Sequence, residues 1–177
     1  SFFQLFPVPV LQGDPNTCLT QPGQMAISRK IAEKYFGQPQ LAVGQEMMMD
    51  NEEVWTVSAV YEEIPATTHF KADFLRSMVG NQQVANDPPM WAMSNNFHTY
   101  LLLRPDVTVE AFQQRFRSFS EEKVALTTQQ LLGMSMEEFR KTGQNVLIHL
   151  QKLTDIHLRS DLSYELAPNG SIQYVWI

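Results

Sequence analysis

The pattern of apolar and small polar residues from Val54 to Tyr61 is the best strand candidate in the chain, and it predicts the central strand of a β-sheet. The stretch is rich in β-branched and aromatic residues, which fit a pleated, half-buried surface. A regular strand would place four apolar side chains on one face, namely Trp55, Val57, Ala59 and Tyr61. Pro65 lacks a backbone donor and should end the ladder, so we interpret His69 to Leu75 as a returning strand or extended arm.

The residues before this strand predict a compact strand–helix unit. Met25 to Ile27 has the composition of a short strand, and Ser28 is placed to cap a helix from Arg29 to Phe36 that ends at Gly37. The expected buried stripe of this helix is Ile31, Ala32, Tyr35 and Phe36. Gly44 to Met49 is expected to lead through a hairpin turn at residues 48–52 into the central strand. The apolar segment Phe2 to Leu11, with its two prolines, is expected to be an extended edge piece, followed by a turn at residues 12–16.

The second half of the chain predicts further strands and helices. Val79 to Asn96 is weakly patterned and is interpreted as a loop with one helical turn at most. Strands are expected at Phe97–Arg104 and Val146–Leu153. Thr108 should cap a helix whose apolar positions are Val109, Phe112, Phe116 and Phe119. Two capping-box patterns, Thr127 with Gln130 and Ser135 with Glu138, predict two short helices between Leu126 and Lys141, with Gly143 after the second.

These elements interleave without a strict βαβ repeat, which indicates an α+β fold with mixed sheets and short helices. The 177 residues are enough for one domain or two small lobes, with a join near the Val79–Asn96 loop or near Gly133. We expect a single domain over residues 1–177 whose lobe boundaries the pattern leaves open.

Composition narrows the classes of function. Hydrophobic residues make up 44% and charged residues 18%, which permits a packed core. The net charge of -6 and the pI of about 5.2 disfavour a nucleic-acid binder and electrostatic docking on anionic lipid. The single cysteine, Cys18, excludes an internal disulfide framework. No apolar run is long enough to cross a membrane.

Both ends of the chain are abrupt and apolar. Phe2 to Leu11 opens it, and Tyr174 to Ile177 closes it, without an initiator Met or a leader-like segment. We therefore expect a piece cut from a longer protein, which continues into a hydrophobic segment after Ile177.

The sequence predicts no catalytic, cofactor-binding or metal-binding residues. The four histidines, His69, His98, His149 and His157, show no metal-binding helix spacing. Asp155 and His157 could share one side of a strand, but a third ligand is missing, so a turn Asp and a hydrogen-bonded His are favoured. His98 and His149 fall within predicted strands and are interpreted as packed or rim side chains.

The paired glutamates and Cys18 are also interpreted as non-catalytic. The pairs Glu52-Glu53 and Glu62-Glu63 are adjacent residues that point to opposite faces of a strand, so they do not form a glycosidase pair. Cys18 lacks a neighbouring basic group and is interpreted as an inert thiol. No nucleophile elbow and no phosphate-binding loop is present in the sequence. Met47–Met49 is favoured as core, whereas Met90–Met93, which includes Trp91, is a candidate contact surface in a loop.

Three separated stretches resemble one family when taken together. The first runs to Asp14 and contains Phe-Phe-x-x-Phe and Leu-Gln-Gly-Asp. The second, Ala26 to Gly44, contains Ile-Ser-Arg-Lys-Ile-Ala-Glu-Lys-Tyr-Phe-Gly, and the third is Trp55 to Leu75. In order and spacing they resemble the MacB-like periplasmic core domain of FtsX/MacB-type ABC transporter permeases, in the form common in Bacteroidetes. Ser58-Ala59 departs from the pattern, where a nearby Gly is expected.

The resemblance implies a domain between the first and second transmembrane helices, on the periplasmic face of the cytoplasmic membrane. It implies two lobes, one porter-like α/β and one more variable, and no catalysis or cofactor. The implied partners are the transmembrane part of the same permease, its ATPase, a second permease protomer, and a periplasmic protein or substrate.

Two alternatives remain open at this stage. One is an extracytoplasmic sensor or ligand-binding module of a membrane signalling protein, which requires a closed pocket with convergent polar groups. The other is a small hydrolase built on Asp155 and His157.

Overall fold

The computed structural model describes residues 2–86, 91, 97–156, 159 and 165–166, and the chain divides into two compact units. The first unit is formed by Ser1–Asn86 and Leu153–Ile177, and the second by Asp87–Lys152. The first boundary between them falls within the weakly patterned segment Val79–Asn96. No helix in the described ranges has both the length and the apolar character needed to cross a membrane.

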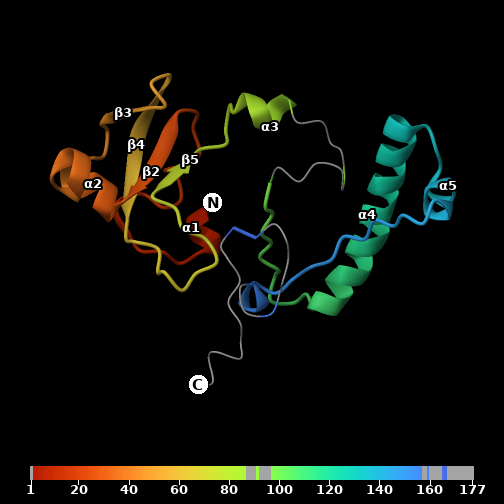
Figure 1. Cartoon of the computed structure of the whole chain (residues 1–177). Coiled ribbons are helices and arrows are strands. Elements are labelled where there is room, and N and C mark those ends of the chain that lie inside the picture. The colour runs from red at the N-terminus through yellow and green to blue at the C-terminus, as the bar shows by residue number, and fades with distance from the viewer. Residues whose placement is uncertain (1, 87–90, 92–96, 157–158, 160–164, 167–177) are drawn as a thin grey trace. The chain divides into compact units, whose positions relative to one another are not determined.

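The first unit is built on one mixed five-stranded sheet. Its strands are β1 (Val10–Gly13), β2 (Gln24–Ser28), β3 (Glu46–Met49), β4 (Glu53–Tyr61) and β5 (Phe74–Arg76). The central strand β4 pairs in parallel with β2 on one edge, and on its other edge it pairs antiparallel with β3 along its first half and with β1 along its second half. β5 then adds antiparallel to the free edge of β2 (Figure 1).

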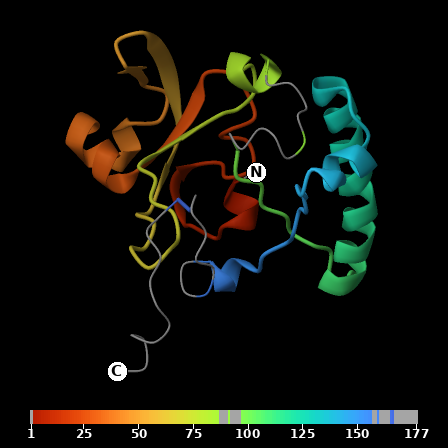
Figure 2. The ribbon, with the colours of Figure 1, turned by 45° about the vertical axis from the view of Figure 1, so that its right-hand side comes forward.

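Helices and loops cover both faces of this sheet. On one face, Ile31 and Ala32 of α2 (Arg29–Phe36) pack on Met25, Ile27, Val57 and Val60. On the other face, Phe3 of α1 (Phe2–Leu5) and Cys18 pack with Ala26, Ala59 and Tyr61. Figures 1 and 2 show α2 and α1 on opposite sides of the strands. The α+β class with a mixed sheet is therefore confirmed.

The predicted faces of β4 are wrong because the strand contains a bulge. Met25 pairs with Val57, but the next residue of β2, Ala26, pairs with Ala59, so Ser58 is an extra residue on β4. A bulge of this kind reverses the alternation beyond it. Consequently Trp55, Val57 and Val60 lie on the α2 side, whereas Ala59 and Tyr61 lie on the α1 side.

Contacts on both sides of β4 fix the bulge at Ser58. The Ser58 hydroxyl donates to the backbone oxygens of Cys18 and Met25, the latter at 2.9 Å. Opposite it, Gly13 has a φ of +89°, and an added Cβ would lie 2.9 Å from the Cα of Ala59 and closer still to the carbonyl oxygen of Ser58. β1 and β4 therefore approach each other at a point where only glycine fits.

The strand–helix unit and the hairpin are confirmed. Ser28 accepts a hydrogen bond from the Ile31 amide at the start of α2, and the Gly37 amide donates to the carbonyl of Glu33 at its end. Asp50 and Asn51 have φ values of 54° and 57°, as both central residues of a type I′ hairpin turn require. A 3-10 turn at Pro39–Leu41 links α2 to β3.

Two details near the N-terminus differ from the prediction. Tyr35 is 57% exposed, because the stripe that packs on the sheet follows Ile31 and Ala32 and leaves Tyr35 at its border. Phe2–Leu5 is helical and not extended. Its aromatic side chains pack together, with the Phe2 ring 4.9 Å from Phe6 and 5.6 Å from Phe70, which favours a turn over an edge strand.

The loop between the two units begins with the predicted helical turn. α3 (Gln82–Asn86) forms it, and the Asn81 side chain accepts a hydrogen bond from the Val84 amide. Most of the following segment lies outside the described residues.

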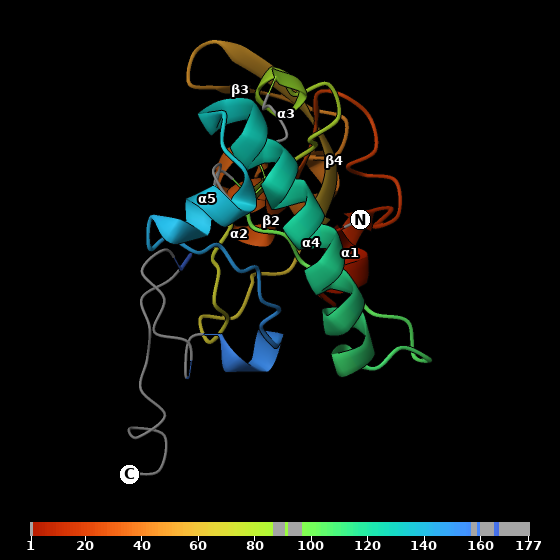
Figure 3. The same ribbon diagram turned by 90° about the vertical axis from the view of Figure 1, so that its right-hand side faces the viewer.

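The second unit is dominated by one long helix, α4 (Val109–Leu132). Thr108 caps its start as predicted, and Gly133 ends it in the left-handed conformation. The predicted break at Thr127 is wrong, since the helix continues and the Thr127 hydroxyl donates to the carbonyl of Lys123. α5 (Met136–Lys141) begins at the Ser135/Glu138 capping box as predicted and lies beside the second half of α4 (Figure 3).

The two strands predicted for this half, Phe97–Arg104 and Val146–Leu153, do not form. Residues 97–104 pair with no strand in the part of the chain that the structure describes, and Phe97, Leu101 and Leu102 are exposed. Val146, Ile148 and Leu150 are half-buried while Leu147 and His149 are exposed, so the expected alternation is present without a strand. The amide of Leu150 donates to the Gln113 side chain of α4 at 3.0 Å instead of to a neighbouring strand. Leu153 begins a 3-10 turn, Leu153–Asp155.

Candidate functional site

A group of charged side chains lies where α2 begins and β4 ends. Arg29 forms an ion pair with Glu62 at 2.6 Å, and the Glu63 carboxylate accepts the backbone amide of Lys30 at 2.9 Å. The Lys30 ammonium reaches Asp73 at 3.0 Å. These contacts join residues that are 33 to 43 positions apart in the chain.

Asp73 is the hub of this group, which we call the α2 clamp (Ser28, Arg29, Lys30, Glu62, Glu63 and Asp73). Its carboxylate accepts hydrogen bonds from the Lys30 ammonium and the Ser28 hydroxyl, both at 3.0 Å, and its carbonyl accepts the Ser28 amide. The hydrogen bond from Lys30 is the main reason why the pKa of Asp73 is lowered, and Ser28 adds to the effect. Asp73 thus stays ionised and holds the arm before β5 against the start of α2.

Tyr61 anchors the same arm from inside the sheet. Its side chain is fully buried, and its phenol donates to the carbonyl of Ala72 at 2.8 Å. Burial raises the pKa of Tyr61, so the phenol remains a proton donor at physiological pH. In the α2 clamp each carboxylate already has a cationic or amide partner, and the arrangement serves attachment better than acid–base chemistry.

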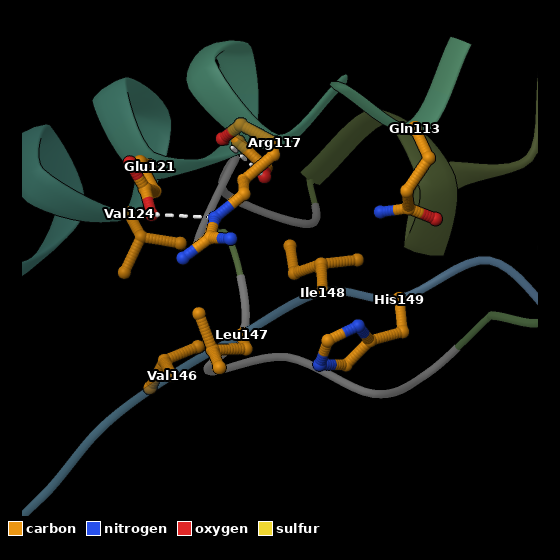
Figure 4. A pocket seen from close by; sticks show the side chains of 9 residues that line it. Gln113, Arg117, Glu121, Val124, Val146, Leu147, Ile148 and His149 are labelled. Atoms are coloured by element: carbon orange, nitrogen blue, oxygen red, sulfur yellow. Dashed lines mark hydrogen bonds and ion pairs between the residues drawn. The ribbon is translucent and has the colours of Figure 1, made fainter. Parts of the chain in front are cut away.

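A second feature is a small cleft between α4 and the extended segment that follows α5. Gln113, Arg117, Ser120, Glu121 and Val124 line it from α4, and residues 146–149 line it from the other side (Figure 4). Arg117 is paired with Glu121 at 3.3 Å, one helical turn away. The volume of this cleft is about 100 Å³, well below the several hundred Å³ typical of a pocket for an organic ligand.

Those predicted candidates that lie among the described residues are not brought together into a reactive site. Asp155 pairs with Arg159 at 3.7 Å, and His157 lies outside the described residues. His149 lines the small cleft, and His98 is exposed in the unpaired segment. Within the described ranges, no three His, Cys, Asp or Glu side chains are grouped in a way that could hold a metal ion.

Cys18 is buried, and two of the three methionines at residues 47–49 pack against the core. Cys18 is 2% exposed, and burial raises its pKa, which agrees with an inert thiol. Met47 and Met49 pack against the core as expected, but Met48 is 65% exposed. Of the segment Met90–Met93 only Trp91 is described, and its ring lies 5.4 Å from that of Phe119.

The polar contacts of the α2 clamp were not predicted from the sequence. Glu62 and Glu63 were considered only as a carboxylate pair, and Asp73 lies within His69 to Leu75, which was expected to be a returning strand or extended arm. The available signal was the run Ser28-Arg29-Lys30 at a helix start together with two carboxylates at a strand end, because both are expected at one edge of a sheet.

The fold defines an α+β domain whose mixed sheet is covered on both faces. The chain matches the model of the MacB-like periplasmic core domain over residues 1–119, more than half of its 177 residues, and it belongs to this family. It is thus of the class of extracytoplasmic domains found in permease-type transporters.

Comparison with solved structures and curated proteins adds little more. A crystal structure of a domain of a protein assigned as a permease, from Porphyromonas gingivalis, shares 18% identity, with 73% of this chain and 54% of that chain covered and a TM-score of 0.44. The chain therefore spans about half the length of that structure. Curated proteins provide no significant match.

Proposed function

We propose that this chain is a non-catalytic periplasmic domain of an ABC transporter permease, which transmits ATPase-driven motion to a substrate or a partner protein. The observation that carries the proposal is the family match over residues 1–119. The whole chain would be a single domain inserted between two transmembrane helices at the periplasmic face of the inner membrane. Its partners would be the rest of the permease, the ATPase and a second protomer.

The contacts of the first unit fit a part that moves as a rigid body. The α2 clamp and the Tyr61–Ala72 hydrogen bond tie the helix, the central strand and the arm before β5 together. A force applied to any one of these elements would be carried by the others, since their contacts combine ion pairs with a buried core.

The location can be tested with the full-length protein in cells. Glu33 is exposed on α2, and Cys18 is buried, so Glu33→Cys introduces the only accessible thiol of this chain. We expect a membrane-impermeant maleimide to label Glu33→Cys in intact cells, while the unsubstituted protein is labelled only after denaturation. Labelling of Glu33→Cys only after cell lysis would contradict a periplasmic location.

The coupling can be tested separately, on the full-length permease reconstituted with its ATPase. Spin labels at Glu33→Cys and at Gln130→Cys, which is exposed on α4, report the distance between the two units. We expect the distance distribution to differ between the nucleotide-free and ATP-locked states. The same distribution in both states would refute coupling but leave the location intact.

The parent reading frame decides between this function and the sensor alternative. A permease-type set of transmembrane helices after Ile177 is expected, and a kinase or cyclase there would favour the ligand-binding module instead.

A further inference from the structure

The β3–β4 hairpin combines an open sheet edge with exposed apolar side chains. β3 pairs with β4 on one side, and no other strand of the described chain pairs with it. Met48 and Val54 lie opposite each other across the two strands and are 65% and 53% exposed. Figure 1 shows the hairpin at one end of the sheet, with β3 as its outer strand.

The backbone of β3 offers hydrogen-bonding groups on its outer side. The Val57 amide donates to the carbonyl of Gln45, so Gln45 faces β4. Because consecutive residues of an antiparallel strand face in opposite directions, the amide and carbonyl groups of Glu46 and Met48 point away from β4. A strand that pairs with β3 would use these four groups.

Natural edge strands are usually protected by a lysine, a proline or a bulge. β3 has the sequence Glu-Met-Met-Met and pairs with β4 in continuous register, so it carries none of these devices. Among the described residues, its protection consists of its short length and the charge of Glu46.

The charges around the hairpin determine what could pair with it. Glu46, Asp50 and Glu52 are exposed and form no ion pair within the described residues, whereas Glu53 is paired with Arg76 at 2.9 Å. The hairpin is therefore acidic, which opposes docking on anionic lipid and pairing with the same acidic edge of a second copy. The carboxylates are also not grouped so as to hold one metal ion.

We propose that the outer edge of β3 binds an extended, basic segment of another polypeptide, which adds to the sheet as a further strand. On the face that Met48 shares with Glu46, it would place an apolar side chain beside Met48 and lysine or arginine side chains beside Glu46 and near Asp50 and Glu52. This mode of recognition combines main-chain hydrogen bonds with side-chain selection. The proposal rests on the hairpin alone and holds whether or not the chain couples to an ATPase.

The test uses the 177-residue chain and an eight-residue peptide, Lys-Thr-Val-Thr repeated twice, which places lysine and valine alternately on one face of the strand. We expect the peptide to bind in a fluorescence-anisotropy titration, and the corresponding peptide with glutamate in place of lysine to bind at least about tenfold more weakly. Hydrogen exchange should show new protection at the amides of Glu46 and Met48. Absence of binding, equal binding of both peptides, or binding to phosphatidylserine vesicles would overturn the proposal.

Met48→Pro is the decisive variant, because the amide it removes faces away from β4 and proline is tolerated at such positions. We expect it to weaken peptide binding by about tenfold, the effect of losing one or two backbone hydrogen bonds. Glu33→Gln on α2 removes one charge far from the edge in sequence and should leave binding unchanged. Should Met48→Pro fail to fold, Met48→Lys, which adds an edge lysine, provides the same test. Undiminished binding by the folded variant would refute strand addition.

Discussion

The close approach of β1 to β4 at Gly13 makes a quantitative prediction. Gly13→Ala places a methyl group against the backbone of Ser58 and Ala59, with the Cβ 2.9 Å from the Cα of Ala59. The positive φ of +89° adds the strain of a left-handed conformation, about 1–2 kcal/mol for a residue with a Cβ. The steric overlap requires the two strands to separate, at a further cost of about 1–3 kcal/mol.

Gly44→Ala separates these two contributions. Gly44 has a φ of +86°, nearly the same as Gly13, but an added Cβ meets no atom within 4 Å. Gly44→Ala should therefore lower the free energy of unfolding only by the strain of the left-handed backbone conformation. We expect Gly13→Ala to be the more destabilising by roughly 1–3 kcal/mol, a large part of a typical domain stability.

Urea-dependent hydrogen exchange, read on peptides that cover β2 and β4, reports this difference for the first unit alone. Both variants must first give the far-UV circular dichroism of the unsubstituted chain. Equal destabilisation by Gly13→Ala and Gly44→Ala would show that the strands can separate without cost, and would refute the role assigned to the close approach.

Three further substitutions test other contacts, each by urea unfolding at neutral pH unless stated. Ser58→Ala removes the hydroxyl that bridges two backbone carbonyls and should destabilise the first unit by about 1–3 kcal/mol, whereas the exposed Thr67→Ala should have little effect. The pKa of Asp73 is lowered by folding, so its stabilising effect is present above the unfolded value of about 4 and is lost as the pH falls through the folded pKa. The urea midpoints of the unsubstituted chain and Asp73→Asn should therefore converge on acidification from about pH 7 to about pH 3, and parallel midpoints would contradict this. Ser135→Ala removes the cap of α5 and should speed hydrogen exchange there by an amount equivalent to about 1 kcal/mol, unlike the exposed Ser118→Ala on α4.

Elements whose signals are local were predicted well. α2 begins and ends where Ser28 and Gly37 indicate, because both caps act on backbone groups within one turn. The hairpin turn at Asp50 and Asn51 is local in the same sense. The capping box at Ser135 was predicted correctly, but the same pattern at Thr127 was not a cap. There the preceding residues are already helical, so the amides are satisfied and the hydroxyl turns back to Lys123.

Features that depend on distant partners could not be predicted. Phe97–Arg104 has the composition of a strand, but composition reports the fit to a pleated surface and does not show that a neighbouring strand exists. The bulge at Ser58 depends on register against β2, and the α2 clamp depends on Asp73 meeting Ser28 across 45 positions.

The bulge has a consequence for how this sheet tolerates changes in chain length. With Ser58 present, β4 delivers Val60 to one layer of the protein and Tyr61 to the other. Deleting Ser58 would remove the bulge and leave Val57, Ala59, Val60 and Tyr61 in regular alternation, so each would keep its present layer and its partner on β2. A deletion between Ala59 and Tyr61 would instead direct Tyr61 to the α2 side and break its hydrogen bond to Ala72, so the effect of losing one residue depends on whether that residue belongs to the bulge.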